Sequence, residues 1–171
     1  SITFFILTLD IIFEIIFGHN MMGNVSSMSG RIASFFGDEL VAGAFYHGFI
    51  LIFLSYLTYK KVKPPILLFI IISLLIISFL IGERSNFIKI FLSIIIFTAI
   101  VVKIDMRLKI LSLIFTLLSF LVLTNLNDSY KTRYLDQLKT LFSVNGYKNY
   151  LMESQYGAHR DAAFKILKEN K

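Results

Sequence analysis

The sequence contains no cysteine among its 171 residues, and charged residues make up only 16% of it. The absence of cysteine excludes a disulfide framework, a thiol nucleophile and a thiolate metal site. Ordinary soluble domains have about 25% charged and about 45–50% apolar residues. The hydrophobic share here is 56%. The composition therefore argues against an ordinary water-soluble globule.

Long apolar runs account for the mean hydropathy of +0.74. A bilayer core about 30 Å thick needs about 20 apolar residues in a helix. Three runs meet this directly, a fourth does so if Lys89 extends to the interface, and a fifth opens the sequence. We expect an internal fragment, because the chain begins inside an apolar run and ends within a helical pattern. The sequence predicts an all-α, polytopic membrane helix bundle in residues 1–127, with five spans near 1–17, 40–59, 64–82, 86–102 and 110–127.

Basic residues in short connectors predict the orientation, since such residues are held on the cytoplasmic side. Connectors 60–63 and 103–109 carry three Lys or Arg each, whereas segment 18–39 has only Arg31 and turn 82–86 only Arg84. We therefore place the two basic connectors inside and the other segments outside. Basic residues scattered through connectors also argue against a nucleic-acid partner.

The tail, residues 128–171, is expected to be a periplasmic helical loop that is cut short at its end. Apolar residues recur at helical spacing at Tyr134, Leu138, Leu141 and Phe142, which predicts an amphipathic helix over 130–142. A second amphipathic helix is expected to begin near Ala158. Together they predict an external amphipathic helix pair.

Arg84 is predicted to lie in a short external turn between two spans. Its planar guanidinium suits phosphate and pyrophosphate, because two parallel hydrogen bonds fix the ligand's orientation. The alternative is an interfacial arginine bonded to Glu83, to lipid phosphate or to a helix-end carbonyl.

Acidic residues near the external side allow two readings each. Asp38 suits the N-cap of the following span, while Asp38 and Glu39 together could bind a cation or sugar hydroxyls.

Asp10 and Glu14 share one helix face, where like charges repel, so either one is protonated or a cation lies between them. They could form a proton relay or an acid–base pair, or Glu14 could simply be wet, being one turn from Gly18.

His159 and Arg160 open the last helix and could act as a base and a phosphate clamp, although an exposed histidine there commonly has no such role. No His or Cys residues have metal-ligand spacing, so no metal site is predicted. The motifs GxxxxGK[ST], GxSxG and HExxH are absent, and neither nucleotide chemistry nor another cofactor is expected.

Taken in order, four pieces of the sequence resemble the O-antigen ligase and O-antigen polymerase superfamily of bacterial envelopes. The resemblance spans nearly the whole chain, and all four pieces fall on the side expected to be external. They are Asp10 with residues 17–20 and Gly23, residues 30–39, the turn 82–86, and residues 159–166.

The resemblance implies a multi-pass inverting glycosyltransferase of the bacterial inner membrane. It would take an undecaprenyl-pyrophosphate-linked glycan as donor at the periplasmic face and a glycan or lipid A-core as acceptor. External arginines would hold the pyrophosphate, and the general base would lie downstream of Lys171, so no catalytic residue is assigned here. Glu83 departs from the small residue usual before the arginine. The predicted substrate-binding residues are Arg84, Arg31, Arg160, His159, Asp38 and Glu39.

A transporter or flippase fragment for an anionic or lipid-linked substrate is the alternative function. Asp10 and Glu14 would then be coupling sites, and the arginines would select the anion. A span interrupted internally by Gly or Pro would favour transport, and the well-formed spans contain no such interruption.

Overall fold

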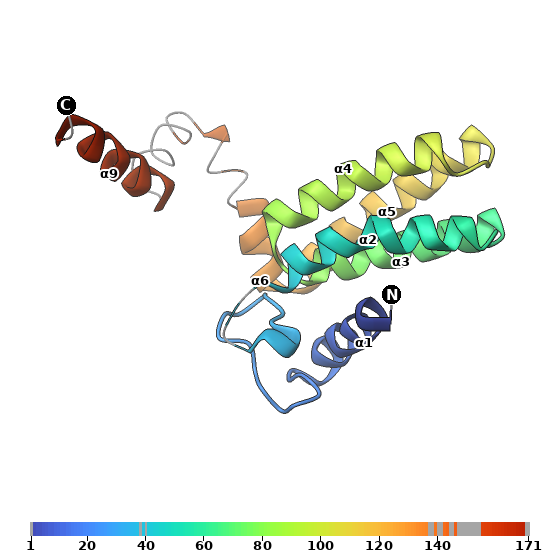
Figure 1. Ribbon diagram of the computed structural model, residues 1–171, viewed down its shortest axis with the longest axis horizontal. Helices are drawn as coiled ribbons and strands as arrows, with labels where there is room; N and C mark the ends of the chain where they lie inside the picture. Colours follow the sequence, from blue (N-terminus) through green and yellow to red (C-terminus); the bar gives the residue numbers. More distant parts are fainter. Residues whose placement is uncertain are drawn as a thin grey trace. The chain divides into compact units, whose positions relative to one another are not determined.

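The computed structural model describes residues 2–37, 39, 41–136, 139, 142–143, 146 and 155–169 (Figure 1). Every regular element in these residues is a helix, which confirms the all-α prediction. The chain divides into two compact units, Ser1–Tyr130 and Lys131–Lys171.

The first unit contains the five long helices expected from the apolar runs. The largest shift from the predicted bounds is at the start of the last one, which begins at Met106 rather than at residue 110. The helices are α1 (Ile2–Phe17), α2 (Ala42–Tyr59), α3 (Pro64–Leu80), α4 (Arg84–Ile100) and α5 (Met106–Leu126), followed by the short α6 (Asp128–Tyr130).

Helix length supports fewer membrane spans than the sequence predicts. Within the described residues, α2 and α5 are long and apolar enough to cross a membrane, and α3 is a shorter apolar helix. Helices α1, α3 and α4 have 16, 17 and 17 residues. By length and hydropathy, the structure thus supports two candidate spans rather than five.

Proline and a distant carboxylate explain two of the helix starts. Pro64 and Pro65 occupy the first turn of α3, where their missing N–H groups cost nothing. The N-cap of α2 is Val41, without a side-chain cap hydrogen bond, and Asp38, which was predicted as the N-cap, lies outside the described residues. Instead, the Glu83 carboxylate accepts a hydrogen bond from the Gly43 N–H at 2.8 Å, which places negative charge at the positive end of the α2 dipole.

Helices α2, α3, α4 and α5 lie side by side, and α1 packs against α2 and α3 (Figure 1). Their facing sides bury aliphatic residues such as Ile50, Ile71 and Ile94. The turns α2–α3 and α4–α5 share one end of this bundle, which we name the connector end. The loop 18–41 and the turn 81–83 lie at the opposite end, which we name the loop end.

Aromatic rings hold the loop end of α3, α4 and α5 together. The ring centroids of Phe79 and Phe120 are 4.8 Å apart, and Phe87 lies 5.4 Å from the first and 5.1 Å from the second. The Tyr130 hydroxyl donates a hydrogen bond to the Leu80 carbonyl at 2.8 Å. The end of α3 is therefore fixed, which positions the turn that precedes Arg84.

In the second unit, residues Lys131–Asp136 form a π-helix and Gln155–Glu169 form α9. Residues 130–136 of the helix predicted over 130–142 are therefore helical, and residues 131–136 adopt the wider π type. Leu138 and Leu141 lie outside the described residues. Helix α9 confirms the second predicted helix, which begins at Gln155 rather than near Ala158.

Candidate functional site

Two carboxylates of α1 hold the loop 18–41 at the loop end. Asp10 accepts hydrogen bonds from the Met21 N–H at 2.7 Å and from the Ser34 hydroxyl. Glu14 accepts from the N–H groups of Ala33 at 3.2 Å and of Ser34 at 2.6 Å. Each of the four carboxylate oxygens therefore accepts a hydrogen bond from this loop.

This arrangement corrects the sequence-based view of the pair. Asp10 is 0% and Glu14 3% exposed, so the interpretation of Glu14 as a wet residue is wrong. The loop folds back over the end of α1 and covers it. The donors from the backbone and from Ser34 satisfy both side chains, so the two acidic residues can share one helix face.

Asn20 and Ser34, which the sequence analysis did not single out, complete the fold of the loop. The Asn20 amide is buried and donates to the Ser34 carbonyl at 2.7 Å, while its oxygen accepts from the N–H groups of Met22 at 3.0 Å and Asn24 at 2.8 Å. Ser34 has a φ of 53°, which non-glycine residues rarely adopt. Neither residue was predicted as a site residue, although both lie in segments that carry the resemblance, residues 17–20 and 30–39.

The same loop also docks on the turn between α3 and α4. The Ile32 N–H donates to the Ile81 carbonyl at 3.0 Å. The Arg31 guanidinium lies 3.5 Å from the carboxylate of Glu83, and this carboxylate also accepts from the Asn86 amide at 2.6 Å. Glu83 is therefore buried and satisfied by neighbours from three segments: the loop, α2 and α4.

Two glycines allow this close approach. Gly82 has a φ of +78°, and a Cβ there would lie 1.9 Å from the Gly30 carbonyl oxygen. A Cβ on Gly43 would lie 2.7 Å from the carboxyl carbon of Glu83. Gly82 therefore allows the backbone contact between the loop and the turn, and Gly43 leaves room for the Glu83 side chain against α2.

Arg84 is the first residue of α4 rather than part of the turn, and its side chain is half-buried. Arg31, not Arg84, forms the ion pair with Glu83, so the alternative in which Arg84 pairs with Glu83 is wrong. Within the described part of the chain, the Arg84 guanidinium has no hydrogen bond or ion pair. The N-cap Glu83 makes no side-chain cap bond, which leaves first-turn N–H groups of α4 without an intrahelical acceptor.

The other predicted site residues are not brought to this place. Glu39 is exposed, Asp38 lies outside the described residues, and His159 is exposed on α9 of the second unit. The side chain of Arg160 also lies outside the described part. Thus the structure brings Arg31 to Glu83, the residue next to Arg84 in the sequence, and does not gather the rest.

Among the described residues, no group of three or more His, Cys, Asp or Glu could hold a metal ion. No family model matches this sequence, and no curated protein or solved structure matches it either. The resemblance to O-antigen ligases and polymerases therefore stays a prediction.

Proposed function

We propose that the chain is part of a membrane glycosyltransferase of the O-antigen ligase or polymerase type. Its donor would be an undecaprenyl-pyrophosphate-linked glycan, and its acceptor a glycan or lipid A-core at the periplasmic face. The observation that carries the proposal is Arg84, a half-buried residue at the amino end of α4 whose guanidinium has no partner in the described part of the chain.

The chemistry of glycan transfer from a lipid pyrophosphate fits this position. The leaving pyrophosphate gains negative charge in the transition state. A cation already positioned beside this charge stabilises the transition state and lowers the activation barrier of glycan transfer. A guanidinium can donate two parallel hydrogen bonds to phosphate oxygens. The free N–H groups and the dipole at the start of α4 favour an anion at the same place. Arg84 would therefore bind the leaving group.

Glu83 raises an electrostatic objection, because a carboxylate next to Arg84 would repel a pyrophosphate. Its charge is balanced within the protein, by the guanidinium of Arg31 and by hydrogen bonds from Gly43 and Asn86. Arg31 thus supports the site by neutralising Glu83. We expect Arg31 to contribute to donor binding indirectly, through this pair.

Membrane placement of the whole bundle is part of the proposal, with α1, α3 and α4 crossing alongside α2 and α5. Its support is the apolar outer surface of the shorter helices, with Phe5 on α1 57% exposed, Phe69 on α3 70% exposed and Ile96 on α4 59% exposed. Large apolar patches are costly in water, and a bilayer adapts to short spans by thinning at modest cost. The loop end would face the periplasm.

The engaged carboxylates weigh against the transporter alternative. That function requires Asp10 and Glu14 to exchange a coupling ion or proton, yet each of their oxygens already accepts a hydrogen bond from the loop. Their contacts favour a role as anchors.

The test compares lysine and alanine at position 84 in the full-length protein, with glycan transfer from a lipid-pyrophosphate donor as readout. We expect Arg84→Lys to lose about 30- to 1000-fold in rate, nearly as much as Arg84→Ala, because the fork geometry is lost although the charge remains. Arg107, exposed at the connector end, supplies the control, and Arg107→Lys should leave the rate unchanged. Near-normal transfer by folded Arg84→Lys would refute the pyrophosphate role.

A further inference from the structure

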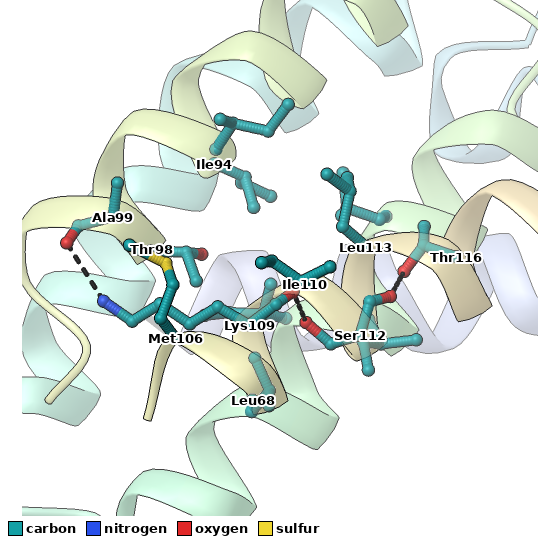
Figure 2. A pocket seen from close by; sticks show the side chains of 14 residues that line it. Leu68, Ile94, Thr98, Ala99, Met106, Lys109, Ile110, Ser112, Leu113 and Thr116 are labelled. Carbon is teal, nitrogen blue, oxygen red and sulfur yellow. Dashed lines mark hydrogen bonds between the residues drawn. The ribbon is translucent and has the colours of Figure 1, made fainter. Parts of the chain in front are cut away.

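A second feature of the first unit lies near the connector end, away from Arg84. A cleft of about 170 Å³ opens between α3, α4 and α5 (Figure 2). Aliphatic side chains form most of its lining, among them Leu68 on α3, Ile94 on α4 and Leu113 on α5. Such a lining suits a hydrocarbon chain rather than a polar ligand.

Lys109 supplies a fixed positive charge at one side of this cleft. Its ammonium donates a hydrogen bond to the carbonyl of Ala99, near the end of α4, at 3.0 Å (Figure 2). The negative end of the α4 dipole stabilises a cation here. Since an ammonium has three donors, two remain for another acceptor. The Lys109 ammonium is thus held in place by one hydrogen bond and keeps two donors for a ligand.

The hydroxyls beside the cleft differ in their bonding. Ser112 donates to the Lys109 carbonyl and Thr116 to the Ser112 carbonyl, as Figure 2 shows. By contrast, the oxygen of Thr98 is buried and has no hydrogen-bond partner in the described residues. The cleft therefore combines an apolar interior with a cation and an unsatisfied hydroxyl on its α4–α5 side.

The surroundings of the cleft are positively charged. Lys103 and Arg107 precede Lys109 in the same connector, and Lys60, Lys61 and Lys63 occupy the neighbouring connector at the same end of the bundle. Asp105 is the only acidic residue in these two connectors. An apolar cleft beside a cluster of cations is complementary to an anionic amphiphile.

We propose that this cleft binds an anionic phospholipid of the cytoplasmic leaflet, with an acyl chain between α3, α4 and α5 and the phosphate against Lys109. A lipid with a neutral headgroup would fill the cleft equally well but gain less from the lysine. The inference rests on the membrane placement in the proposed function, and it is independent of glycan transfer.

The 171 residues contain no tryptophan, so once any tryptophan elsewhere in the full-length protein is replaced by phenylalanine, one introduced indole reports on a single place. In Met106→Trp the indole stands at the cleft, since Met106 lines it and is 66% exposed. Tyr56→Trp is the matched control on α2: Tyr56 is 47% exposed and has the Lys60 ammonium 5.7 Å from its ring, but it does not line the cleft. Both full-length variants are reconstituted in phosphatidylcholine bilayers, and quenching by brominated phosphatidylglycerol is compared with quenching by brominated phosphatidylcholine.

We expect phosphatidylglycerol to bind at Met106→Trp about fivefold better than phosphatidylcholine, the effect of roughly one lysine near an anionic headgroup. The ratio of quenching by brominated phosphatidylglycerol to quenching by brominated phosphatidylcholine should be lower for Tyr56→Trp than for Met106→Trp. Adding Lys109→Gln to Met106→Trp should reduce its ratio to the control value, whereas adding Lys89→Gln, which removes an exposed charge from the loop-end half of α4, should leave it nearly unchanged. Ile110→Trp, also at the cleft, replaces Met106→Trp should the latter fail to fold.

The outcomes separate the lipid site from the membrane placement. Quenching of Tyr56→Trp by both lipids supports the placement. Three results would then overturn the lipid site alone. They are equal phosphatidylglycerol-to-phosphatidylcholine quenching ratios at the two tryptophans, no effect of Lys109→Gln on this ratio, and an unquenched indole at the cleft. An unquenched Tyr56→Trp would overturn the membrane placement and the lipid site with it.

Discussion

At the loop end of the bundle, acidic side chains are buried and bonded to a long loop, whereas at the connector end charged side chains lie on the surface of short turns. Glu14 and Glu83 are 3% and 8% exposed. Lys60, Lys61 and Lys103 are exposed. Hydrogen bonds to buried charged groups contribute about 1.5–3 kcal/mol each, while exposed charges contribute little to stability. The buried acids therefore stabilise the shape of the loop, whereas the exposed bases contribute little to stability, and in the proposed membrane placement they would set the orientation.

The largest expected difference between the two ends is their accessibility in cells. Lys61→Cys and Met22→Cys each introduce the sole cysteine of the chain at an exposed site. Because basic connectors stay in the cytoplasm, an impermeant thiol reagent should label Met22→Cys on intact cells and Lys61→Cys only after permeabilisation. The reverse pattern would invert the proposed orientation.

A stability difference of several kcal/mol is expected between two glycines. Gly82→Ala adds a Cβ 1.9 Å from the Gly30 oxygen at a φ of +78°, so left-handed strain and overlap should together cost about 2–4 kcal/mol. Gly48 lies within α2 with nothing within 4 Å of its would-be Cβ. Gly48→Ala should therefore stabilise by about 1 kcal/mol. Thermal unfolding in detergent measures the melting temperature of each variant. If Gly82→Ala and Gly48→Ala shifted it equally, the loop–turn contact would contribute no stability.

The helices could be predicted from sequence because each is set by local features. Uninterrupted apolar runs and the Pro64–Pro65 pair fixed their positions to within a few residues. The prediction of Arg84 at one end of the bundle also follows from local order, since it comes directly after an apolar run. Its place as the first helical residue, beside a buried Glu83, required the structure.

The fold of the loop could not be predicted, because its contacts join residues far apart in sequence. Arg31 meets Glu83, and Ser34 meets both Asp10 and Glu14. Ser34 also has a left-handed backbone, which no local residue pattern predicts. One signal was available: two acidic residues on one face of an apolar helix need donors, and the nearest polar segment is this loop.

The smallest effect we expect is at Glu14, and it tests whether the buried acids anchor the loop. Glu14→Gln preserves the shape but removes the charge and turns one acceptor oxygen into an NH2 group. That group would face the N–H of Ala33 or Ser34, leaving a buried donor unsatisfied at a cost of about 1–3 kcal/mol. Amide exchange at Ala33 and Ser34 should accelerate accordingly. Glu39→Gln, which changes an exposed acid in the same loop, should alter stability by no more than about 0.5 kcal/mol. If the two variants exchange alike, the carboxylate of Glu14 does not hold the loop, and the position of Arg31 beside Glu83 must depend on Asp10 and on the turn contacts.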